Sequence, residues 1–166
     1  ESPDSSDASY SPDDSTASLA FSPGGSRLAS ITTDCVVRVW NVDTGSQVFE
    51  LISNGDMLLD AAYSPDGRWI AASSRGGRIT IWDAVTGKEL FALKGHTDRA
   101  TCVAFDPTTQ QLVSGSDDKT VRTWDLRSPL EYATFPAGSG IVECDPNERF
   151  FAIGYFGGVQ LIGEFL

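Results

Sequence analysis

The sequence predicts an all-β fold built from short antiparallel strands in repeated sheets, and three observations support this prediction. Tryptophans recur 42 residues apart, at Trp40, Trp82 and Trp124. Proline turns recur at the same step, at Ser22-Pro23, Ser64-Pro65 and Asp106-Pro107. Between these marks lie short β-branched and aromatic runs separated by turn residues, and no window of about ten residues shows the apolar face of an amphipathic helix.

The strands can be placed most clearly in the third copy of the repeat. Residues 101–105, 111–116 and 120–124 are runs of strand-forming residues, and Pro-Thr-Thr and Asp-Asp-Lys separate them as turns. A fourth strand is predicted after each tryptophan turn, over residues 47–51 in the first copy and 89–93 in the second. Each complete copy therefore has four short strands, with the tryptophan near the end of the third.

A fainter fourth copy contains the Cys144-Asp145-Pro146 turn and, after it, the apolar run at residues 159–163. Four antiparallel strands in a period of about 40–45 residues are typical of a β-propeller blade. The sequence thus predicts a partial or open β-propeller of about four blades, over approximately residues 11–52, 53–93, 94–135 and 136–166. The acidic, Ser/Asp-rich residues 1–10 are interpreted as a flexible leader, the alternative being an outer strand of a neighbouring blade.

The sequence resembles the WD-repeat (WD40) family over roughly residues 11–166. The third copy carries the resemblance most fully, with Gly95-His96, Asp106-Pro107, Ser114-Gly115-Ser116, Asp118 and Trp124-Asp125. The first copy keeps Ser30, Asp34 and Trp40-Asn41. The second keeps Trp82-Asp83 but has Ala72 and Gly76 where Ser and Asp would stand.

The single His of the chain allows two interpretations. The resemblance implies that His96, Ser114, Asp118 and Trp124 form a buried, hydrogen-bonded structural tetrad, of which Ser30, Asp34, Trp40 and Trp82 are the counterparts in the other copies. A Ser-His-Asp hydrolase triad is the alternative. The triad needs an exposed Ser hydroxyl and an oxyanion hole, and the sequence contains no G-x-S-x-G elbow. The structural tetrad is therefore the preferred interpretation.

The resemblance also implies where partners bind, namely three and five residues after the His and just before the Asp of each copy. Carried over by position, the candidates are Arg99, Thr101 and Asp117 in the third copy, Met57, Leu59 and Arg75 in the second, Ser15, Ala17 and Thr33 in the first, and Tyr155 in the fourth. In the second and first copies, Asn54 and Pro12 stand in place of the His. Apolar residues beside arginines suit a partner with an apolar anchor and an acidic flank. The alternative is that Met57 and Leu59 pack under a loop and that the arginines are only solvated.

Composition excludes several function classes. The 23 acidic and 12 basic residues give a net charge of −11, which argues against a nucleic-acid surface. No apolar run approaches the roughly 18 residues of a membrane helix. One His and three scattered cysteines predict no metal site, and no cofactor motif is present. Cys35, Cys102 and Cys144 are interpreted as reduced and mostly buried in an intracellular protein, cytoplasmic or nuclear, with a disulfide as the alternative.

Together these features predict a non-catalytic protein–protein interaction scaffold that presents a propeller face to partner proteins. One alternative is a peptide-motif recognition subunit of a larger regulatory complex, and another is a propeller-based hydrolase. An open propeller leaves two blade flanks uncovered. We therefore expect further blades, or a second copy of the chain, to complete it.

Overall fold

The computed structural model describes residues 16–32, 34–53, 55–107, 111–127, 130–136, 140–144, 150–155 and 158–163. Every regular element in these ranges is a β-strand. The strands are β1 (Thr16–Phe21), β2 (Arg27–Thr32), β3 (Val36–Asn41), β4 (Gln47–Ile52), β5 (Leu58–Tyr63), β6 (Trp69–Ser74), β7 (Ile79–Asp83), β8 (Glu89–Leu93), β9 (Ala100–Phe105), β10 (Leu112–Ser116), β11 (Thr120–Asp125), β12 (Leu130–Pro136), β13 (Gly140–Cys144), β14 (Phe150–Tyr155) and β15 (Gly158–Gly163). In the described part of the chain there is thus no helix that could span a membrane.

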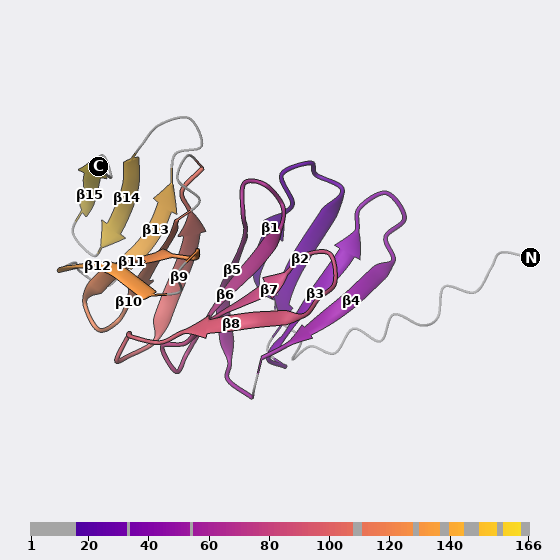
Figure 1. Cartoon of the computed structure of the whole chain (residues 1–166), viewed down its shortest axis with the longest axis horizontal. Coiled ribbons are helices and arrows are strands. Elements are labelled where there is room, and N and C mark those ends of the chain that lie inside the picture. Colours follow the sequence, from indigo (N-terminus) through magenta and orange to yellow (C-terminus); the bar gives the residue numbers. More distant parts are fainter. Residues whose placement is uncertain are drawn as a thin grey trace, which may run out of the picture.

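The strands form four antiparallel sheets, which we call blades 1 to 4. Their strand orders are β1-β2-β3-β4, β5-β6-β7-β8, β9-β10-β11-β12 and β13-β14-β15. Figure 1 shows the blades side by side in chain order as an open fan, with blade 1 at one end and blade 4 at the other. The prediction of an all-β fold with about four antiparallel blades is confirmed.

The proline turns are closed by the side chain of the serine that begins them. The Ser22 hydroxyl accepts a hydrogen bond from Arg27 N at 3.0 Å, and the Ser64 hydroxyl accepts one from Trp69 N at 2.9 Å. In the second turn Gly67 has a φ of +71°, which glycine adopts without steric cost. These bonds fix where β2 and β6 begin, and so they set the register of each first hairpin.

Two apolar cores lie between consecutive blades. Side chains alternate between the two faces of a strand, so blade 2 contributes to both cores. Trp82 faces blade 1 and Trp124 faces blade 2, each only 1% exposed. The core between blades 1 and 2 contains Ala29, Ile31, Val37, Val39, Leu51, Leu58, Ala61, Ile70, Ala72, Trp82 and Ala84. The core between blades 2 and 3 contains Ala71, Ile79, Ile81, Leu93, Ala100, Val103, Phe105, Leu112, Trp124 and Leu126.

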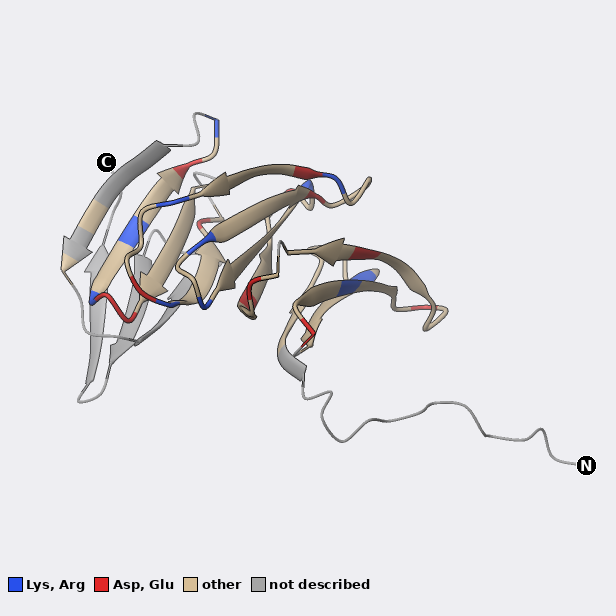
Figure 2. Cartoon of the chain, turned by 90° about the horizontal axis from the view of Figure 1, so that it is seen from below, with Lys and Arg blue, Asp and Glu red and all other residues tan. Residues whose placement is uncertain are grey.

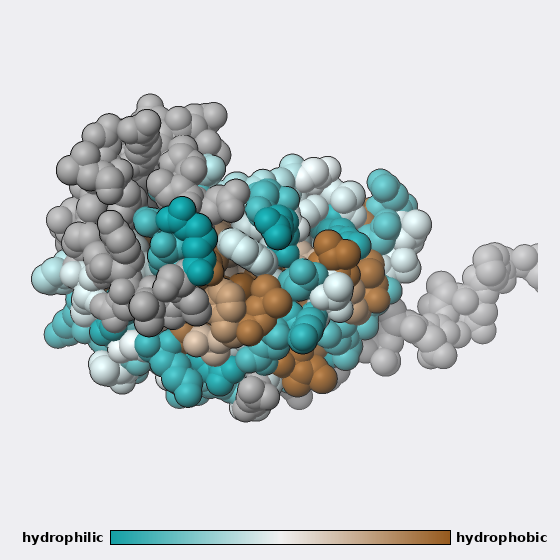
Figure 3. Space-filling view, viewed as in Figure 1, coloured by the Kyte–Doolittle hydropathy of each residue, from teal (hydrophilic) through white to brown (hydrophobic). Residues whose placement is uncertain are grey.

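The outer face of blade 1 is uncovered. Leu19 is 60% exposed, whereas Ala61 and Val103, which occupy the same position one and two repeats later, are 6% and 4% exposed. Phe21 is 61% exposed, whereas its counterpart Phe105 is 6% exposed. Brown apolar patches are visible among polar surface over the part of the molecule formed by blades 1 and 2 (Figure 3). The same strand position therefore serves as core in blades 2 and 3 and as surface in blade 1.

Several sequence-based expectations fall outside the described residues. Residues 1–10, Pro12, Ser15, Thr33 and Asn54 are not described. Ala17 lies in β1 and Tyr155 in β14, where the structure describes the strand but not these side chains; the same holds for Cys144 in β13. Cys35 is a half-buried free thiol and Cys102 a buried one. The proposed blade boundaries and the flexible leader stay predictions.

Candidate functional site

The predicted tetrad residues of blade 3 lie in one hydrogen-bonded chain. Trp124 Nε1 donates to Ser114 Oγ at 2.9 Å, and Ser114 Oγ lies 2.8 Å from His96 Nε2. His96 Nδ1 lies 2.9 Å from Asp118 Oδ2. Because the Ser114 oxygen already accepts from the indole, its own proton is available for Nε2, which leaves the imidazole proton on Nδ1 to donate to the carboxylate. Each donor in the chain then has an acceptor.

Asp118 also ties the β10–β11 turn to the segment before β9. Its carboxylate accepts hydrogen bonds from Thr97 N at 3.1 Å, and from Thr120 N at 2.9 Å and Thr120 Oγ1 at 2.6 Å. Burial would raise the pKa of the Asp118 carboxyl, but the hydrogen bonds from Thr120, His96 and Thr97 outweigh it and hold the pKa well below its usual range. The carboxylate therefore remains an acceptor at neutral pH.

The same geometry is unsuited to hydrolysis. Ser114 is 0% exposed, and the side chains of His96 and Asp118 are 0% and 5% exposed. A nucleophilic Ser needs an open side from which a substrate carbonyl can approach. Here the Ser114 hydroxyl is enclosed by the Trp124 indole and the His96 ring, so the arrangement can fix a turn but cannot reach a substrate.

Blade 1 holds only part of the corresponding network. Trp40 Nε1 donates to Ser30 Oγ at 2.9 Å, as Trp124 does to Ser114. Asp34 does not continue this chain. It is an exposed residue that pairs with Arg38, and this guanidinium is the main cause that lowers the pKa of Asp34 to about 2. In blade 1 the tetrad positions therefore form two separate interactions.

Blade 2 replaces the tetrad with a residue that the sequence interpretation did not single out. Trp82 is buried in the core, and Asp56 takes over the capping of the β6–β7 turn. Its carboxylate accepts from Ser74 Oγ at 2.6 Å and from Gly76 N at 3.1 Å. A Cβ on Gly76 would lie 2.5 Å from Asp56 Oδ2. The carboxylate of Asp56 thus occupies the space that a side chain at position 76 would need.

The candidate partner-binding residues meet at one edge of the fan. We call this edge, formed by the β4–β5, β6–β7, β8–β9 and β10–β11 connections, the tetrad edge. Arg75 N donates to Met57 O at 2.8 Å, and one repeat later Asp117 N donates to Arg99 O at 3.0 Å. The structure therefore brings the predicted residues together as two equivalent pairs, one in each blade.

The two pairs differ in charge. Arg99 Nη2 forms an ion pair with Asp117 Oδ2 at 2.6 Å, so this guanidinium already has a carboxylate partner. The exposed Arg75 side chain has no hydrogen bond or ion pair within the described ranges. Of these two arginines, Arg75 alone has a guanidinium without an anionic partner among the described residues. Acidic and basic residues are otherwise interspersed over the described strands and turns (Figure 2).

The apolar candidates beside Arg75 are only partly open to solvent. Met57 and Leu59 are both half-buried, which leaves contact area without a large exposed patch. Thr101, one repeat after Leu59, is half-buried and donates from Oγ1 to Gly115 O at 3.3 Å.

Within the described residues, no group of three or more His, Cys, Asp or Glu side chains is arranged to hold a metal ion.

A second residue missed by sequence reasoning links three blades. The Asp60 carboxylate on β5 accepts from Ser18 Oγ in blade 1 at 2.7 Å and from Val103 N in blade 3 at 3.0 Å. It also accepts from Ala61 N at 2.9 Å. Asp60 is thus a polar bridge between the innermost strands, and it holds neighbouring blades in a fixed relation beneath the tetrad edge.

Comparison with known proteins places this arrangement in a family. The model for the WD domain, G-beta repeat, matches residues 7–41, 45–83 and 87–125. The chain belongs to this WD40 repeat family, whose members generally act as non-catalytic interaction scaffolds. No curated protein matches the chain significantly.

Solved structures share the fold of this chain at low sequence identity. The structure of U3-55K is 25% identical with a TM-score of 0.81, and the match covers 91% of this chain and 49% of that one. The crystal structure of RRP9 WD40 repeats is 26% identical with a TM-score of 0.81, over 91% of this chain and 48% of that one. The chain spans about half the length of these structures.

Proposed function

We propose that the chain is a non-catalytic scaffold that binds a partner protein through the tetrad edge of blades 2 and 3. The observation that carries the proposal is the exposed, unpaired Arg75 guanidinium beside the half-buried Met57 and Leu59. Hydrogen-bonded turns hold these residues on a rigid sheet, so binding costs little ordering entropy. Arginine next to apolar anchors is typical of the residues that dominate interface energies.

The partner's contacting segment should carry an apolar anchor next to an acidic residue. The anchor would contact Met57 and Leu59, and the carboxylate would pair with Arg75. The Arg99–Asp117 ion pair has no net charge and serves as a polar border to this contact. A short peptide motif can satisfy these requirements as well as a folded domain does, which keeps a peptide-motif recognition subunit of a larger complex as the second candidate.

The test is affinity capture from a cell extract with Arg75→Glu, quantified by mass spectrometry. The matched control is Lys88→Glu, which makes the same charge change on an exposed residue of the same blade but at the opposite edge. We expect Arg75→Glu to lose specific partners that Lys88→Glu retains. Equal capture by both variants would refute the proposal, and activity of the purified chain in a broad hydrolase screen would favour the enzyme class instead.

We also propose that the open face of blade 1 binds another blade. Its apolar residues Leu19 and Phe21 are exposed, whereas the residues at the same positions that pack against a preceding blade, Ala61, Val103 and Phe105, are buried. In a solution of this chain alone, the available blade is that of a second copy. Light scattering should show concentration-dependent association that Leu19→Lys with Phe21→Lys abolishes. A monodisperse monomer at all concentrations would exclude this mode of association.

A further inference from the structure

A hollow of about 240 Å³ lies between blades 1 and 2 at the edge opposite the tetrad edge. We call this opposite edge, formed by the β1–β2, β3–β4, β5–β6 and β7–β8 turns, the turn edge. The hollow is lined by residues of three of these turns and of the strands beside them. Arg27, Tyr63 and Ala84 lie in its wall, together with Pro23, Asp66 and Val85.

The equivalent place between blades 2 and 3 is filled by apolar side chains. One repeat after Arg27, Tyr63 and Ala84 stand Trp69, Phe105 and Leu126. Phe105 and Leu126 are 6% and 5% exposed in the core between blades 2 and 3, and Trp69 packs against the same core. At this junction the three positions therefore hold packed apolar side chains.

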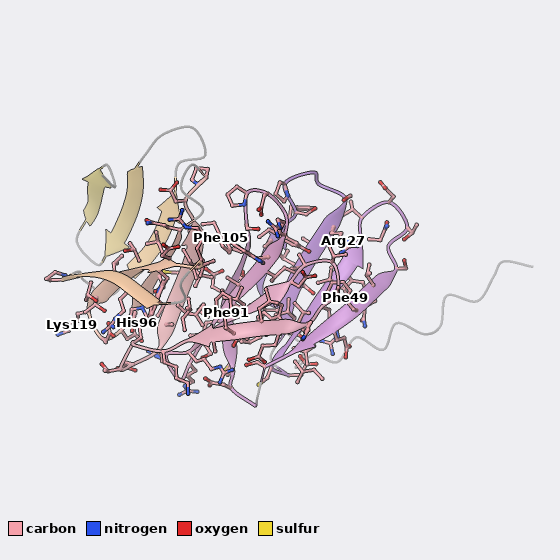
Figure 4. All side chains as sticks on the ribbon, viewed as in Figure 1. Arg27, Phe49, Phe91, His96, Phe105 and Lys119 are labelled. Carbon is pink, nitrogen blue, oxygen red and sulfur yellow. The ribbon has the colours of Figure 1, made fainter. Side chains whose placement is uncertain are left out.

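Between blades 1 and 2, a different residue replaces each of these three apolar side chains. The first junction has the cation of Arg27 where the second has an indole, the phenol of Tyr63 where the second has a phenyl ring, and the methyl group of Ala84 where the second has an isobutyl group. Only the phenylalanine on the fourth strand is kept, as Phe49 and Phe91. Figure 4 labels Arg27 and Phe49 at the first junction, and Phe91 and Phe105 at the second. Each substitution adds polarity or removes volume, and together they leave a polar hollow.

The Arg27 side chain is held in place but has no anionic partner. Its guanidinium lies 5.7 Å from the Phe49 ring centroid, and Nη1 donates to Ala84 O at 2.6 Å. Over the residues that the structure describes, it forms no ion pair. A guanidinium has five N–H donors, and a half-buried cation is stabilised by a carboxylate. Arg27 therefore keeps N–H donors for an anionic acceptor that the described part of the chain does not supply.

Tyr63 adds a second donor without a partner. Its hydroxyl oxygen is buried and forms no hydrogen bond with any described residue. Leaving such a group unsatisfied costs stability, and a phenylalanine would avoid the cost, as Phe105 does one repeat later. Burial raises the pKa of Tyr63, against the opposing effect of the Arg27 charge, so the phenol stays protonated and can donate. An unsatisfied donor beside an unpaired cation indicates an anionic acceptor.

Among the described residues that line the hollow, Asp66 supplies the one carboxylate, and this group already has hydrogen-bond partners. Asp66 is exposed, and its Oδ1 accepts from Ser64 Oγ at 2.6 Å and from Arg68 N at 3.1 Å. Its charge disfavours an anion at its own side of the hollow. An incoming carboxylate is therefore directed to the Arg27 and Tyr63 side.

We propose that this hollow binds the carboxylate of an acidic side chain of a partner polypeptide, with Arg27 supplying the charge and the Tyr63 hydroxyl a second hydrogen bond. The exposed Pro23 and Val85 then contact the apolar part of the neighbouring residues. The proposal rests on the chain's role as an interaction scaffold. It uses the turn edge, however, so it can fail while binding at the tetrad edge stands, and the reverse also holds.

The test is an NMR titration of the 166-residue chain with N-acetylglutamate N-methylamide, observing the Arg27 Nε–H and the Tyr63 ring signals. The neutral matched probe is N-acetylglutamine N-methylamide. We expect saturable shifts at both residues with the glutamate probe, and binding about tenfold weaker with the glutamine probe, the value of one hydrogen bond to a charged group. No saturable shift, or equal binding of the two probes, overturns the proposal.

Three variants test the residues separately. Tyr63→Phe should bind the glutamate probe several-fold more weakly while its melting temperature is no lower than that of the wild type; a lower melting temperature would show that the hydroxyl has a structural partner and overturn the proposal. Ala84→Leu copies Leu126, fills the hollow and should abolish binding without removing either donor. Arg68→Gln, which removes an exposed cation outside the hollow, is the control and should bind normally. Weakened binding by this control would show general ionic attraction and refute the assignment.

Discussion

Replacing His96 with alanine tests the structural interpretation of the tetrad. The substitution removes the ring that joins Ser114 to Asp118, at 2.8 Å and 2.9 Å. The Asp118 carboxylate keeps its hydrogen bonds from Thr97 N and from Thr120, so it still has partners. The Ser114 hydroxyl, which is fully buried, loses its acceptor. The main cost is therefore one buried unsatisfied hydroxyl and the space left by the ring.

We expect this cost to be about 2 kcal/mol of unfolding free energy, within the 1–3 kcal/mol range for a buried group left without its partner. For a domain of this size, that corresponds to a fall in melting temperature of about 4–8 °C. Urea unfolding gives the free energy and calorimetry gives the melting temperature. Lys94→Ala, at an exposed position two residues earlier, is the control and should leave both values unchanged.

A double-mutant cycle with Ser114→Ala sharpens this test. Ser114→Ala leaves the indole N–H of Trp124 without its acceptor and the Nε2 of His96 without its donor. Alone, it should therefore lower the free energy of unfolding at least as much as His96→Ala. Because the two residues share one network, the double variant should be more stable than the sum of the single costs predicts, by about 0.5–3 kcal/mol. Additive costs, or a His96→Ala variant as stable as Lys94→Ala, would refute the hydrogen-bonded tetrad as a stabilising unit.

Other predictions follow from the inter-blade contacts and from the buried carboxylate. Asp60→Ala should lower unfolding free energy by more than Ser18→Ala, because it breaks the bonds to blades 1 and 3 together; equal losses in urea unfolding would contradict the bridge. Gly77→Ala should lower the free energy of unfolding by more than about 1 kcal/mol, because φ is +78° and the new Cβ would lie 2.7 Å and 2.8 Å from the carbonyl oxygens of Asp98 and His96. A Cβ at Gly24 would contact no atom within 4 Å, so Gly24→Ala should leave the free energy of unfolding unchanged. Because folding lowers the pKa of Asp118, the ionised carboxylate adds to the free energy of unfolding; this contribution is complete above about pH 4 and is lost as pH falls through the folded pKa. In Asp118→Asn the free energy of unfolding should therefore fall less on acidification. A pH profile of stability equal to that of the wild type would contradict this prediction.

Much of the fold could be predicted from the sequence because its signals are local and repeated. The spacing of Trp40, Trp82 and Trp124 gives the length of each blade. The Ser-Pro turns mark the first hairpin because the serine hydroxyl itself closes the turn. The predicted strands at residues 101–105 and 89–93 agree with β9 and β8.

The sequence interpretation missed features that arise between blades. Asp56 caps a turn 20 residues away, and Asp60 bonds to a strand 43 residues away, and neither contact leaves a mark in the local pattern. Gly76, which stands where the repeat pattern has Asp, leaves free the space that the Asp56 carboxylate occupies. The exposure of Phe21 could not be predicted either, because its strand pattern matches that of Phe105 and only the presence or absence of a preceding blade distinguishes the two residues.

Amide hydrogen exchange with a captured partner tests the central claim, that binding uses the tetrad edge, most directly. We predict slower exchange on binding at residues 55–59 and 74–77, around Met57 and Arg75. The β3–β4 turn at residues 42–46, on the turn edge but outside the hollow that Arg27 lines, should exchange as in the free chain. Unchanged exchange around Met57 and Arg75 in the bound chain would contradict the account.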